Sequence, residues 1–169
     1  MNITRLFPAA AIAVGLLVSP AFAKGNGAQA FVDKAAVAGM FEVQASELAI
    51  KVSKDPDVRK FADMMISDHS KAGAELEALA EEQGFKVPSK LDKEHAAKLK
   101  ELEDAGGQFD APYIKAQLEG HQAAVKLFEA YSNSGENHAL QNFAVQTLPT
   151  LRMHLDTIEE MGDRVGATK

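Results

Sequence analysis

Residues 55–84 read DPDVRKFADMMISDHSKAGAELEALAEEQG, and this stretch decides the fold. Its apolar residues recur three and four positions apart, which is the spacing of one face of an α-helix. Asp55 and Pro56 favour a helix start, and Gly84 favours a helix end. The stretch therefore predicts an amphipathic helix roughly 40 Å long. Its core-facing stripe holds Phe61, Met65, His69, Ala72, Leu76 and Leu79.

The same spacing recurs in three further segments, at about residues 28–54, 110–132 and 137–162. Asp110 is expected to cap the second of these helices, and Pro149 is expected to kink the third. No stretch after residue 23 alternates polar and apolar residues as a half-buried strand does. The predicted fold class is therefore all-α, with four long helices packed as a bundle.

A long connection separates the second and third bundle helices. Residues 84–107 hold a short amphipathic pattern through Leu91, Leu99 and Leu102. A hairpin needs far fewer residues than this. We expect a ferritin-like four-helix bundle, in which this connection carries a short extra helix and runs along the bundle; a plain up-down bundle with a decorated loop is the alternative.

The first 23 residues have the pattern of an export signal. Arg5 precedes an apolar run over residues 9–18, Pro20 breaks the run, and residues 21–23 read AFA, a small-residue cleavage site. The run is too short for a good membrane span, and no later stretch is long and apolar enough to be one. We therefore expect residues 24–169 to form one soluble domain, located in the periplasm or secreted.

Composition excludes several classes of site and partner. The chain has no cysteine, which excludes disulfides, thiolate metal sites and covalent c-type haem attachment. Its formal net charge is −6, and loss of Arg5 with the signal makes the mature chain one unit more negative. Because phosphate binding needs a basic patch, we expect no nucleic-acid partner.

Four polar residues occupy core-facing positions on the four long helices: Glu42, His69, His121 and His154. Burying a carboxylate or an imidazole without a hydrogen-bond partner costs free energy, on the order of several kcal/mol for the four groups together. The pattern thus indicates a shared polar network or a bound ion. Imidazole with one carboxylate suits zinc, copper, nickel or iron better than calcium or magnesium.

Helix lengths predict how high each of these groups lies. Glu42 and His69 stand equally far from the Asp55-Pro56 turn, so we expect them at the same height, in contact directly or through an ion. His121 and His154 are expected roughly 8 Å apart along the bundle axis if the helix ends are flush. Supporting contacts to the imidazoles are expected from three neighbours, Asp68, Tyr113 and Gln117.

The chain resembles a known family through four motifs: residues 61–69 (FADMMISDH), residues 109–113 (FDAPY), His121, and residues 148–155 (LPTLRMHL). It is similar to the exported bacterial family catalogued as domain of unknown function 4142. The resemblance implies a ferritin-like bundle without a settled activity, with Glu42 and the three histidines at recurring positions. Di-iron bundles use Glu-x-x-His pairs, and none of the five histidines has a glutamate three residues before it.

Two functions follow from these observations. The first is an exported helical bundle that binds a transition metal through Glu42, His69, His121 and His154. The alternative is a non-catalytic envelope or stress-related interaction protein, in which the same residues form a structural polar network. Neither function identifies a reaction or a substrate, so the sequence leaves enzyme status undecided.

Overall fold

The computed structural model describes residues 26–165, and these residues form five α-helices and no β-strand. The expected all-α class is confirmed. The expected export signal, residues 1–23, lies outside the described residues. The helices are α1 (Asn26–Val52), α2 (Pro56–Gln83), α3 (Lys93–Asp104), α4 (Asp110–Ser134) and α5 (His138–Val165), with a short 3-10 turn, η1 (Gly106–Gln108), before α4. None of the described helices is long and apolar enough to cross a bilayer.

Both ends of α2 form as its sequence predicts. The Asp55 side chain accepts hydrogen bonds from the backbone N–H groups of Asp57 and Val58, at 2.8 and 3.2 Å. At the other end Gly84 adopts the left-handed conformation, with φ of 69°, which a residue without Cβ adopts without strain. These two caps fix the length of the helix that carries His69.

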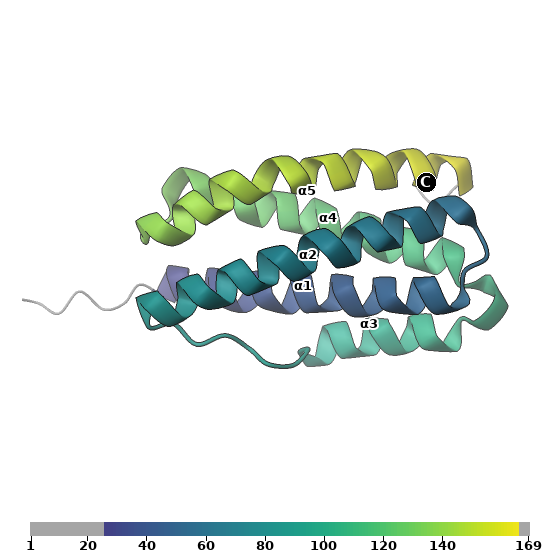
Figure 1. The fold of residues 1–169 in the computed structure, drawn as a ribbon, viewed down its shortest axis with the longest axis horizontal. Helices are drawn as coiled ribbons and strands as arrows, with labels where there is room; N and C mark the ends of the chain where they lie inside the picture. Colours follow the sequence, from purple (N-terminus) through teal and green to yellow (C-terminus); the bar gives the residue numbers. More distant parts are fainter. Residues whose placement is uncertain (1–25, 166–169) are drawn as a thin grey trace, which may run out of the picture.

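The four long helices pack as two antiparallel hairpins, α1 with α2 and α4 with α5 (Figure 1). α2 ends beside the start of α1, and the chain then returns along the outside of the bundle through α3 before α4 begins at the opposite end. α1 therefore lies antiparallel to α4, and α2 lies antiparallel to α5. This arrangement brings one face of each long helix to a common interior.

Helix boundaries on the second hairpin differ from those expected. Asp110 is not the N-cap of α4: Phe109 precedes the helix with helical φ and ψ of −63° and −40°, and no side chain caps this end. The η1 turn continues almost directly into α4, so the helix needs no separate start signal there. α4 extends to Ser134, and α5 runs through Pro149 and continues past Gly162.

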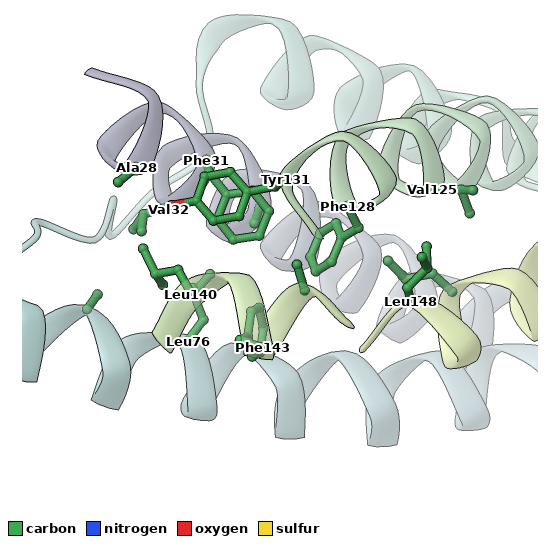
Figure 2. Packing of buried hydrophobic residues seen from close by; sticks show 14 residues of the cluster. Ala28, Phe31, Val32, Leu76, Val125, Phe128, Tyr131, Leu140, Phe143 and Leu148 are labelled. Atoms are coloured by element: carbon green, nitrogen blue, oxygen red, sulfur yellow. The ribbon is translucent and has the colours of Figure 1, made fainter. Parts of the chain in front are cut away.

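The apolar core is divided into two clusters. One cluster lies towards the start of α1, where the rings of Phe31 and Tyr131 stack with centroids 4.0 Å apart (Figure 2). The other lies towards the α1–α2 turn and contains Phe61, Met65 and Ile158. On each of the helices α2, α4 and α5 a histidine stands between residues of the two clusters. A polar layer therefore crosses the middle of the bundle.

Candidate metal centre

Three imidazoles meet in this polar layer, each from a different helix. His69 comes from α2, His121 from α4 and His154 from α5. Their ring centroids lie 5.4 to 5.6 Å apart. Each ring offers a nitrogen, and these nitrogens all lie within 4.8 Å of one another. Helices far apart in sequence thus bring three metal-ligating groups to one point.

The expected 8 Å offset between His121 and His154 is wrong, because their ring centroids are 5.4 Å apart. The prediction placed the end of α4 near Ser132, but the helix continues to Ser134, and α5 begins at His138. The distance from His121 to the end of α4 is then closer to the distance from the start of α5 to His154. The remaining offset of about three residues, roughly 4.5 Å, is within reach of two side chains.

Two of the rings are oriented by partners on their outer sides. His121 Nδ1 donates to the backbone carbonyl oxygen of Gln117 at 2.8 Å, and His154 Nε2 contacts Oδ2 of Asp68 at 3.0 Å. A carbonyl oxygen only accepts, and a carboxylate accepts likewise, so each ring carries its proton on this outer nitrogen. The inner nitrogens, His121 Nε2 and His154 Nδ1, therefore present lone pairs in the neutral rings.

The inner nitrogens have no partners in the described chain. His69 Nε2, His121 Nε2 and His154 Nδ1 are all inaccessible to solvent and make no hydrogen bond. His121 and His154 are buried, whereas His69 as a residue is partly exposed. Such orphaned nitrogens are rare in folded proteins, because each loses its hydrogen bonds to water and gains none in return.

Burial keeps the three imidazoles neutral. Burial lowers the pKa of His69 to about 3, and the adjacent His121 and His154 lower it further. Burial also lowers the pKa of His121 to about 4, although its bond to the Gln117 carbonyl opposes the shift. The pKa of His154 is lowered by burial, against the raising effect of Asp68. Neutral imidazole is the form that binds metals, so at neutral pH all three rings are in the form that could hold an ion.

Glu42 lies in the same polar layer but faces α4. It is 3% exposed, and its Oε2 has no hydrogen-bond partner in the described chain. A Cβ on Gly120 would come within 2.5 Å of Glu42 Oε1, so glycine is what makes room for the carboxyl there. Burial raises the pKa of Glu42 to about 8, against the opposing effects of the Gln117 amide and the Lys98 charge. Glu42 is not part of the 4.8 Å group that the three imidazoles form.

The supporting residues expected from the sequence lie around this layer, though not all in the expected roles. Asp68 contacts His154 rather than the adjacent His69, and Gln117 acts through its backbone carbonyl. The Tyr113 hydroxyl is 2.9 Å from Ser46 Oγ and bonds no imidazole. Burial raises the pKa of this phenol.

Sequence reasoning missed Ser46 and Gly120. Ser46 stands four residues after Glu42, on the same helix face, so the helical spacing already contained that signal. Gly120 precedes His121, and its closeness to Glu42 follows from how α1 packs on α4.

A pocket of about 720 Å³ leads from the surface to this layer. Glu42, His69, His121 and His154 all line it, so all four predicted ligands share one cavity. Its other walls combine apolar side chains of α1, α2, α4 and α5 with polar and charged side chains. Ligand sites typically combine such apolar walls with a few convergent polar groups.

The raised pKa of Glu42 predicts a stability effect of Glu42→Gln in the metal-free protein. The folded chain keeps the proton up to about pH 8, whereas the unfolded chain releases it near pH 4.5. Stability is thus lost as pH rises between these values, by about 1.4 kcal/mol per pH unit. The amide of the substituted glutamine mimics the protonated acid, so the variant should be more stable than wild type by about 3 kcal/mol at pH 7.

Urea unfolding with a chelator present, at pH 4.5 and at pH 7.5, measures this difference. The advantage of Glu42→Gln should be small at pH 4.5 and large at pH 7.5. An equal advantage at both pH values would show that the carboxyl does not titrate as its burial implies. Glu47→Gln, at an exposed position on the same helix, is the matched control and should change stability little at either pH.

Comparison with known proteins gives one match. A family model described as a domain of unknown function (DUF4142) matches residues 18–161, which include every residue of the polar layer. No curated protein and no solved structure matches the chain.

Proposed function

The chain belongs to the family of the domain of unknown function DUF4142, and from that premise we propose that its function rests on a transition-metal ion held by His69, His121 and His154. Zinc, copper, nickel and iron all accept imidazole ligands. A tetrahedral ion with metal–nitrogen bonds of about 2.1 Å needs its nitrogens roughly 3.4 Å apart. The three nitrogens already lie within 4.8 Å of one another, so side-chain movements of about 1 Å bring them to that geometry.

One observation carries the proposal: three neighbouring imidazoles each have a buried nitrogen without a hydrogen-bond partner in the described chain. The outer contacts to Gln117 and Asp68 hold the protons of His121 and His154 on the far sides of their rings. Two acceptors cannot bond each other, whereas a cation binds both. The same outer contacts are those that orient metal-bound histidines in general.

For Glu42 we propose a place beside the fourth coordination position of the ion. The carboxyl lines the same pocket as the imidazoles, and its Oε2 is unpartnered. Because burial keeps it protonated at neutral pH, it serves as a hydrogen-bond donor there until a cation displaces the proton. The ion itself supplies Lewis-acid or redox chemistry when bound.

The alternative proposal, a structural polar network in an envelope or stress-related protein, draws support from one contact. Ser46 and Tyr113 satisfy each other at 2.9 Å next to Glu42, as residues of a register-fixing network do. We further propose a ferritin-like connectivity, supported by the return of the chain along the bundle through α3, and export of residues 24–169 as one domain, supported by the pattern of residues 1–23.

Metal content tests the proposed function. Protein purified without a histidine tag or chelators, then equilibrated with zinc, copper, nickel or iron, should hold close to one ion per chain by elemental analysis. His121→Ala should reduce this to background while circular dichroism stays helical. His138→Ala, an exposed histidine at the start of α5, should bind as wild type does. Unchanged metal content in His121→Ala would support the structural network instead.

A further inference from the structure

The wide entrance of the pocket is marked by two glycines in helix interiors. Gly39 on α1 and Gly73 on α2 both line it. Glycine is the least favourable residue of a helix interior after proline. Neither has a positive φ, and a Cβ at either position would meet no atom within 4 Å. Neither backbone conformation nor crowding requires glycine here, and a larger side chain at either position would take up open space at the pocket.

The interior of the pocket combines an apolar wall with the unpartnered nitrogens. Buried or partly buried side chains from four helices form the wall: Ala35, Ala72, Leu76, Phe128, Phe143 and Leu151. The imidazoles of His121 and His154 line the same space, 1% and 0% exposed, each with a nitrogen that has no partner in the described chain. A cavity of about 720 Å³ holds a small organic molecule as well as an ion.

The charges of the bound ion and of the pocket rim indicate which class of organic molecule fits. Three neutral imidazoles leave both charges of a divalent ion in place, and an ionised Glu42 beside the open position offsets only one of them, so that position still favours an anionic oxygen. The rim is mostly acidic, since Glu47, Glu75 and Glu77 line it with Lys71 as the opposing charge, and all four are exposed. An acidic rim repels a preformed anion. A neutral weak acid passes the rim and becomes an anion only when it binds the metal.

We propose that the pocket binds a small, uncharged organic acid with an O–H group and an apolar body, whose oxygen takes the open position on the metal held by His69, His121 and His154. On binding, the O–H bond breaks, the oxygen keeps the electron pair and bonds the metal, and the proton leaves to solvent. The apolar body lies against the wall on α1, α2, α4 and α5. This inference rests on the proposed metal site and adds its ligand class.

Two hydroxamic acids that share a head group test the inference on cobalt-loaded protein. The visible spectrum of bound Co²⁺ reports a new oxygen ligand. Benzohydroxamic acid, which has an aromatic body, should bind at least tenfold more tightly than acetohydroxamic acid, which has only a methyl group. Gly39→Leu and Gly73→Leu should each reduce that preference at least threefold without changing cobalt affinity. Gly107→Leu, at a glycine outside the pocket with no neighbour within 4 Å, should leave the preference unchanged.

Each other outcome counts against the inference. Bound cobalt with equal affinity for the two acids, or with no response to either, would overturn the ligand class and leave the metal site standing. A colour change with cobalt missing from the protein after gel filtration would mean extraction by the acid, and would overturn it also. Protein that binds no cobalt at all would overturn the proposed function itself, and the inference with it.

Discussion

Acidifying the metal-free protein from pH 6.5 to pH 4 should remove on the order of 3 kcal/mol of folding free energy: about 5 kcal/mol is lost through His69 and His121, and about 2.5 kcal/mol is regained through Glu42. The pKa values of His69 and His121 are about 3 and about 4 in the folded chain, against 6.5 in the unfolded chain. Between these values the unfolded state binds more protons at the two histidines, so their contribution to stability is full above pH 6.5 and is lost as pH falls. A domain has only about 5 to 15 kcal/mol in total. The protein should therefore lose a large share of its stability by pH 4.

Chemical unfolding at half-unit pH steps, with chelator present, measures this slope. A combined variant with His69→Leu, His121→Leu and His154→Leu removes the titrating histidines but keeps Glu42, so its stability should instead rise as pH falls from 6.5 to 4.5. His95→Leu combined with His138→Leu, away from the layer, should keep the wild-type slope. If the combined core variant still loses unfolding free energy as pH falls, carboxylates elsewhere in the protein are responsible for the acid sensitivity. Because Glu42 acts in the opposite direction up to about pH 8, stability should peak near pH 6.5.

Saturating the site with zinc should raise the melting temperature by roughly 8 to 16 °C. An ion that binds only the folded chain, at a thousand times its Kd, contributes about 4 kcal/mol. For a chain of this length each kcal/mol corresponds to about 2 to 4 °C. Calorimetry at pH 7 with zinc or with chelator measures the difference.

Single-histidine variants decide where the zinc acts. His121→Ala should lose the zinc-dependent rise in melting temperature, because only two of the three imidazole ligands remain. His138→Ala should retain all of it. Equal shifts in both variants would mean that zinc binds the surface rather than the polar layer, and would remove the thermodynamic support for the proposed function.

Capping residues and apolar spacing predicted the helices well, but they predicted the junctions between helices less well. Asp55, Pro56 and Gly84 set the ends of α2 because caps act through nearby backbone atoms. Asp110 was wrong as a cap of α4, since the preceding η1 turn already supplies helical backbone at Phe109. A cap residue marks a helix start only where the chain enters from a non-helical conformation, which sequence alone does not reveal.

The membership of the polar layer was predictable from helical spacing, but its internal arrangement was not. Glu42 and His69 lie at matching distances from their turn, yet the Glu42 carboxyl approaches Gly120 on α4. The position of a residue along the helix axis follows from counting residues. The rotation of the helix about that axis depends on how two neighbouring helices pack against its wide apolar face. The predicted offset between His121 and His154 likewise depended on where α4 ends. The helix continues two residues further than expected, and this reduces the offset by about 3 Å.

An anomalous difference map from crystals grown with zinc tests the central claim most directly. We predict one peak inside the bundle, about 2.1 Å from each of His69 Nε2, His121 Nε2 and His154 Nδ1. A map without a peak among these nitrogens, at a zinc concentration that saturates binding in solution, would contradict the metal site and favour a purely structural polar layer.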